Sequence, residues 1–129
     1  MFGRNAKSAI DSLVGISCRI EGNLHFRGGL RIDGTVNGNV IAEPGEASVL
    51  VVSEHASIIG EVRCANMVVN GRISGPVYCS ELIELQPKAR IVGDVHYKLL
   101  ELHGGAVVSG QLTHEGGVDS PVRLVLSEA

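Results

Sequence analysis

Apolar and polar residues follow one short pattern along most of the chain: an aliphatic residue, any residue, glycine, any residue, and a second aliphatic residue. The glycines of successive copies are 16, 22, 15, 18 and 17 residues apart, a period of roughly 18 residues that indicates an internal structural repeat. The copies are Ile20-x-Gly22-x-Leu24, Val36-x-Gly38-x-Val40, Ile58-x-Gly60-x-Val62, Ile73-x-Gly75-x-Val77, Ile91-x-Gly93-x-Val95 and Val108-x-Gly110-x-Leu112.

Alignment of the copies on glycine separates inward from outward positions. The residue four places before glycine is always small, and the residues two places to either side are always aliphatic. This alternation predicts short strands on both sides of a glycine corner. A second apolar pair follows most of the glycines, so that each period holds about three strands: Leu30/Ile32, Leu50/Val52, Met67/Val69, Ile83/Leu85 and Leu100/Leu102.

Three strands per period, all running in one direction, predict an all-β, single-domain parallel β-helix of about six triangular coils. The general handedness of parallel crossovers favours a right-handed coil. We expect a tail over residues 1–15, the β-helix over residues 16–115 and a flexible C-terminal tail over residues 116–129. The longest interval fits a surface loop at residues 43–47.

The main alternative fold is an antiparallel meander, because Asp33-Gly34, Asn37-Gly38 and Asn70-Gly71 are typical hairpin dipeptides. Gly34 and Gly38 are only four residues apart, which is too close for a strand between two hairpins. Meander turns also recur at about 8–12 residues, well below the period of this chain. The repeat therefore favours the β-helix.

Composition narrows the classes of function. The formal net charge is −3 and the 11 Lys and Arg residues are scattered, so nucleic acid is not an expected partner. The three cysteines include no C-x-x-C pair, which fits a reducing cytoplasm. No apolar stretch is long enough to span a bilayer.

The chain offers no recognisable set of catalytic residues. It lacks a Gly-Lys-Ser/Thr phosphate loop. His25 and His96 fall in the same outward column but four coils apart, too far to share a metal ion. We therefore predict no catalytic, cofactor-binding or metal site. An enzyme on a left-handed β-helix is the less favoured alternative, because only one glycine per coil is regular.

The two ends of a β-helix carry the strongest functional expectation. Each end leaves three strand edges and several core side chains without a covering coil, which invites pairing with another chain. Pairing at both ends does not close and runs on as a filament. We expect this interface to contain Ile20, Leu24 and Phe26 in the first coil and Leu102, Val108 and Leu112 in the last. The alternatives are a short tail folded across each end, or a discrete dimeric interaction module.

The repeat also resembles a known family. Residues 20–26 (IEGNLHF), 30–40 (LRIDGTVNGNV), 68–75 (VVNGRISG) and 85–95 (LQPKARIVGDV) are similar to the bactofilin domain. The resemblance implies a bacterial cytoskeletal protein that polymerises without nucleotide or other cofactor into non-polar filaments. It further implies a position under the inner membrane, where the filament places cell-wall enzymes or polarity factors in cell shape. The family often has an aromatic residue near Gly110, where this chain has Val107 and Val108.

The N-terminus is similar to the short membrane-targeting peptide of many bactofilins. In that reading Met1 and Phe2 insert into the bilayer, while Arg4 and Lys7 meet anionic headgroups. One such peptide gives a marginal, reversible attachment, and a filament that displays many copies holds through avidity.

Overall fold

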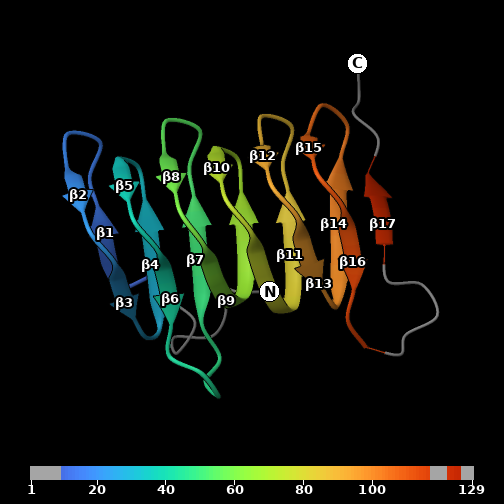
Figure 1. Cartoon of the computed structure of the whole chain (residues 1–129), viewed down its shortest axis with the longest axis horizontal. Coiled ribbons are helices and arrows are strands. Elements are labelled where there is room, and N and C mark those ends of the chain that lie inside the picture. Colours follow the sequence, from blue (N-terminus) through green and yellow to red (C-terminus); the bar gives the residue numbers. More distant parts are fainter. Residues whose placement is uncertain (1–9, 117–121, 126–129) are drawn as a thin grey trace.

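The computed structural model describes residues 10–116 and 122–125, and these form one elongated solenoid of parallel strands (Figure 1). The described residues contain strands and no helix, and the chain advances along the long axis by about six coils. The predicted all-β parallel β-helix is confirmed. Within the described ranges no helix is long and apolar enough to cross a membrane.

The strands stack into three faces, because each coil contributes one strand to each face. The first face contains β1 (Ser12–Val14), β4 (Gly29–Ile32), β7 (Val49–Val52), the later parts of β9 (Val62–Val69) and β11 (Val77–Leu85), β14 (Leu99–His103) and β17 (Val122–Val125). The second contains β2 (Arg19–Glu21), β5 (Thr35–Asn37), β8 (Ser57–Ile59), β10 (Arg72–Ser74), β12 (Arg90–Val92) and β15 (Val107–Ser109). The third contains β3 (Leu24–Phe26), β6 (Val40–Ala42), the earlier parts of β9 and β11, β13 (Val95–Tyr97) and β16 (Leu112–His114).

All strand pairs are parallel, and their register places the aligned repeat positions on top of one another. On the second face Ile73 pairs with Ile58 on one side and with Ile91 on the other. The column continues to Ile20 at one end and to Val108 at the other. The apolar pairs of the first face stack in the same way, as Ile83 and Leu85 do on Met67 and Val69. The ladders predicted from the repeat are therefore those of the structure.

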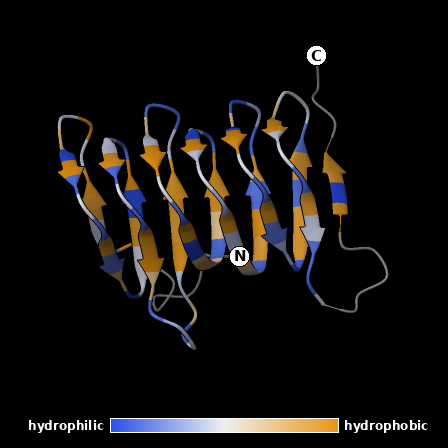
Figure 2. Ribbon diagram, viewed as in Figure 1, coloured by the Kyte–Doolittle hydropathy of each residue, from blue (hydrophilic) through white to orange (hydrophobic). Residues whose placement is uncertain are grey.

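The interior is a continuous aliphatic column that runs the length of the solenoid. Residues of the middle coils, such as Val36, Ile58 and Ile73, have no exposed surface. Figure 2 shows apolar strand residues in every coil. A solenoid of this kind is stabilised mainly by contacts between neighbouring coils, so the coils at the two ends lack half of those contacts.

The glycine of the repeat is required by the close stacking of the backbone at one corner. Gly75 has a φ of +149°, and a Cβ atom there would collide with the carbonyl oxygen of Gly60 in the preceding coil. Gly22 has a φ of +126°, but a Cβ atom on it would meet no other atom within 4 Å, because no coil precedes it. Glycine therefore meets a conformational need at both positions and a spatial need only where two coils stack.

The longest interval between glycines is accommodated by a loop, as predicted. Residues 43–48 leave the solenoid between β6 and β7, and the ladders continue on both sides. Ser48 at its end is buried. Its Oγ accepts a hydrogen bond from the amide of Ala65 at 3.1 Å and lies 3.3 Å from Cys64 Sγ.

The solenoid extends beyond the boundaries predicted from the repeat. β1 lies within the stretch expected to be a tail over residues 1–15, and it pairs with β4 in register. β17 lies within the stretch expected to be a flexible tail over residues 116–129, and it pairs with β14. The tail assignments are wrong for these strands, because Val14, Val122 and Leu124 extend the first-face columns although no glycine of the repeat accompanies them.

Candidate assembly interfaces at the two ends of the solenoid

The N-terminal end of the solenoid presents three open strand edges, one on each face. β1, β2 and β3 each pair with a single strand of the second coil, and their other edges pair with no strand of the described residues. Ile20, Leu24 and Phe26 pack against the core but remain partly exposed. Their counterparts one coil further in, Val36 and Val40, are fully buried. The exposed apolar surface here arises because no coil covers it.

The C-terminal end has the same open character, because β15, β16 and β17 each pair with a single strand among the described residues. β15 and β16 pair only with β12 and β13 within the part of the chain that the structure describes. Leu102 and Val108 are partly buried against the core, and Leu112 is 43% exposed. His114 Nε2 of the same coil has no hydrogen-bond partner among the described residues. On the first face the outer edge of β14 is covered by β17.

The six residues predicted for an interface thus form two groups at opposite ends of the rod (Figure 1). The structure adds to these groups Val14 of β1, the two β17 residues Val122 and Leu124, and Ala106, which stands in the small column of the repeat. Val14 stacks on Ile32, and Leu124 stacks on Leu102. The signal for β17 is a single apolar-x-apolar step, Val122-x-Leu124, and the signal for β1 is Val14 alone, since the preceding position of that column is Ser12. Met1, Phe2, Arg4 and Lys7 lie outside the described residues.

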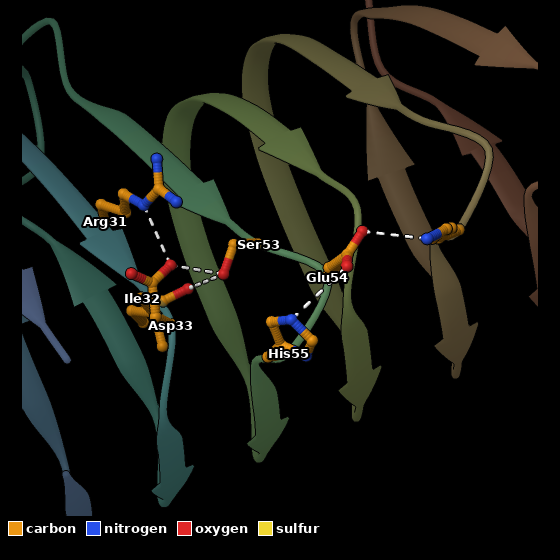
Figure 3. A network of polar contacts seen from close by, with 7 residues as sticks. Arg31, Ile32, Asp33, Ser53, Glu54 and His55 are labelled. Carbon is orange, nitrogen blue, oxygen red and sulfur yellow. Dashed lines mark hydrogen bonds and ion pairs between the residues drawn. The ribbon is translucent and has the colours of Figure 1, made fainter. Parts of the chain in front are cut away.

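A polar network runs along one corner of the solenoid (Figure 3). Arg31 donates a hydrogen bond to Asp33 at 2.9 Å, and the Ser53 hydroxyl also bonds to that carboxylate. Both hydrogen bonds lower the pKa of Asp33, and the one from Ser53 has the larger effect. His55 instead pairs with Glu54 at 3.4 Å. No hydrogen bond joins Ser53 to His55 among the described residues, so serine, histidine and aspartate do not form the relay of a nucleophilic enzyme.

A second polar group lies on the outer surface of the first face near the C-terminal end. Glu84 and Glu101 are neighbours in one ladder, and His103 Nε2 lies 2.9 Å from Glu84 and 3.9 Å from Glu101. Arg123 of β17 pairs with Glu101 at 3.4 Å. Glu84 and His103 are 19 residues apart in the sequence, and the stacking of coils brings them together. His103 and Arg123 already supply these carboxylates with partners.

His96, Cys64 and Cys79 have structural partners. His96 stacks on Tyr78, with ring centroids 4.6 Å apart, and Arg63 covers the Tyr78 ring at 4.0 Å. Cys64 and Cys79 are register neighbours in the interior. Burial raises the pKa of the Cys79 thiol to about 12. This side chain therefore packs as a small apolar group.

Comparison with known proteins identifies the kind of molecule that has this solenoid and these ends. A family model described as bactofilin, polymer-forming cytoskeletal, matches residues 12–113, and the chain belongs to that family. The bactofilin BacO of Myxococcus xanthus (strain DK1622) is 25% identical over 111 residues, which covers 86% of this chain and 85% of the relative. No solved structure matches significantly. The family is one of structural cytoskeletal proteins rather than enzymes.

Proposed function

We propose that this protein is a cytoskeletal scaffold that assembles end to end into non-polar filaments without nucleotide. The observation that carries the proposal is the pair of open ends, each with unpaired strand edges and partly exposed members of the interior columns. Backbone pairing and apolar burial supply the association energy, and neither needs a bound ligand. Complete burial of one aliphatic side chain contributes about 1.5–3 kcal/mol, so a junction that covers several of them is a stable one.

Two like-to-like junctions fit the non-polar arrangement. One joins two N-terminal ends and the other joins two C-terminal ends, each by a two-fold axis, so that every subunit is reversed relative to the next. The chemistry of the ends permits this, because the partly exposed members of the interior columns at both ends are apolar and strand edges pair in either direction.

The direct test is negative-stain electron microscopy of the purified protein in buffer that contains no nucleotide and a metal chelator. We expect uniform thin filaments whose length grows with protein concentration. Discrete dimers at all concentrations would favour the interaction module, and discrete trimers with ligand-dependent activity would favour the left-handed enzyme. Either result would overturn the filament proposal.

We further propose that the filament lies in the cytoplasm against the inner membrane and positions cell-wall enzymes or other morphogenetic proteins. The support is family membership together with the N-terminal sequence, in which Met1 and Phe2 are apolar and Arg4 and Lys7 are cationic. Since a single such peptide binds weakly, attachment depends on assembly, which multiplies the number of peptides per particle.

Deletion of residues 1–9 is expected to abolish co-sedimentation with anionic liposomes while filaments still form, because β1 begins at Ser12 and stays intact. The matched control is Phe2→Leu, which keeps an apolar insertion residue and should retain most of the binding. Equal binding of liposomes by the deletion variant would contradict the membrane proposal and leave the filament proposal standing.

A further inference from the structure

A groove lies along the corner of the solenoid where the chain passes from the third face to the first. Its volume is about 520 Å³, which is the size of many ligand-binding pockets. One wall is the loop at residues 43–48, which projects from the rod (Figure 1). The floor is hollow because small side chains stand where the strands cross the corner: Ala42, Ser48, Cys64, Ala65, Cys79 and Ser80.

The opposite wall of the groove is a stack of flat side chains. Arg63, Tyr78 and His96 are successive members of one outward ladder on the third face. The guanidinium carbon of Arg63 lies 4.0 Å from the centre of the Tyr78 ring, and the Tyr78 and His96 rings are stacked with centroids 4.6 Å apart. A wall of stacked planar groups beside a floor of small side chains suits an apolar or aromatic side chain of a ligand.

The loop wall adds negative charge to the groove. Glu43 and Glu46 both line it, and neither carboxylate forms an ion pair with a described residue. The cations of the opposite wall, Arg63 and His96, already have carboxylate partners outside the loop. By charge complementarity the groove therefore fits an extended peptide that carries an apolar side chain close to cations.

Residues 1–9 of this chain are long enough to reach the groove. The Asp11 amide donates a hydrogen bond to the Gly29 carbonyl, and Gly29 is in register with Val49, directly after the loop wall. The described chain thus begins at the same corner, two coils before the loop wall and four coils before the far end of the floor. These separations are roughly 10 and 19 Å. Nine extended residues span up to about 30 Å, so the segment can lie along the whole groove.

We propose that residues 1–9 of the same subunit occupy this groove in the absence of a membrane, with Phe2 over the floor and Arg4 and Lys7 beside Glu43 and Glu46. The inference rests on the proposed membrane attachment and adds regulation to it, because the residues assigned to the bilayer are those that fill the groove. Groove and bilayer then compete for one peptide. A docked peptide lowers the apparent affinity of a single subunit for lipid, which strengthens the dependence of attachment on assembly.

Carbodiimide, which joins a lysine amine to a carboxylate in contact with it, tests the docked position. An equal mixture of heavy-isotope-labelled and unlabelled full-length protein is treated in buffer without lipid, and the products are analysed by mass spectrometry. We expect Lys7 to be linked to Glu43 or Glu46, with no link between a labelled and an unlabelled chain. Mixed links would place the peptide of another subunit in the groove and overturn the same-chain proposal, as would the absence of any such link.

Peptide binding by a variant that lacks residues 1–9 measures the contribution of the loop charge. A fluorescent peptide of residues 1–9 should bind this variant saturably in an anisotropy titration. Glu46→Lys should raise the dissociation constant at least about threefold, which corresponds to under 1 kcal/mol and to one exposed ion pair. The control is Glu54→Lys, the same change of charge at an exposed position outside the groove, and it should leave the dissociation constant unchanged. Equal dissociation constants for the two variants would contradict docking in this groove.

Anionic liposomes separate the docked peptide from the proposed membrane attachment. When they are added to the full-length protein, the yield of the Lys7 link should fall in proportion to the fraction of protein that co-sediments with them. An unchanged yield from co-sedimented protein would overturn the competition. Failure of the full-length protein to bind liposomes, with the link and the peptide binding intact, would overturn the membrane proposal and leave the docked segment standing.

Discussion

Val108→Arg is expected to reduce assembly by at least about 100-fold in concentration and to stop it at the level of a small particle. Val108 is the last residue of an interior column, and the inner residues of that column are buried. In the free subunit an arginine there can turn its charge to water, because nothing covers the coil. In a junction the same charge would be buried without a partner, which costs several kcal/mol. Analytical ultracentrifugation of the purified variant measures the effect.

The size of the particle that remains reports how subunits are oriented. If junctions are like-to-like, Val108→Arg leaves the N-terminal junction intact and yields dimers, and Ile20→Arg yields dimers through the other end. The double variant should then be a monomer. If subunits instead joined head to tail, each single variant would already be a monomer, which would contradict the non-polar arrangement.

The matched control carries the same substitution on the side of the rod. Ile59 lies on β8 in the middle of the second face and is 53% exposed. Ile59→Arg should form filaments at the wild-type concentration, since lateral surfaces take no part in the proposed junctions. Long filaments from both Val108→Arg and Ile20→Arg would show that these coils are not the interfaces.

Gly75→Ala is expected to destabilise the solenoid by about 3–4 kcal/mol, which is a large fraction of the stability of a small domain. Two costs combine: a residue with a side chain at a φ of +149° is strained, and its Cβ atom would collide with the Gly60 carbonyl oxygen. The backbone must then move apart at the corner, which weakens the ladder between the two coils. Urea unfolding followed by circular dichroism measures the loss, in the double-arginine background that prevents assembly.

Gly22→Ala separates these two costs. Gly22 also has a positive φ, but a Cβ atom there would meet nothing within 4 Å. The loss should be about 1–2 kcal/mol from backbone strain alone. Equal losses from the two variants would indicate that the close stacking of coils at the glycine corner contributes nothing to stability.

The fold could be predicted because every coil obeys the same constraints. Ile73 and Ile91 occupy equivalent places in the repeat, and the structure pairs them directly. The first and last copies of the repeat lie close to the two ends of the rod, which is why Ile20 and Val108 were expected at opposite ends. A periodic interior leaves little freedom in register, because a shift by one residue would turn the apolar set outward.

The contacts that could not be predicted involve outward side chains and the last strand. Asp33 and Ser53 are 20 residues apart, more than one average period, because the loop at residues 43–48 intervenes. Their contact depends on the register after that loop and on side-chain rotamers, neither of which the apolar pattern fixes. β17 has only one apolar step, Val122-x-Leu124, and lacks the glycine motif. So short a strand forms because an open edge of β14 is available, which is a property of the whole fold.

The uniform ladder between β10 and β12 has a consequence for how such chains can change over evolutionary time. Arg72, Ile73 and Ser74 pair with Arg90, Ile91 and Val92, each at the same sequence offset. A duplication or deletion of one such block would insert or remove a whole coil and leave the two ends as they are. Changes of any other length have to be placed in a corner loop, as at residues 43–48. Rod length can therefore vary in whole-coil steps, independently of the surfaces through which one molecule meets the next.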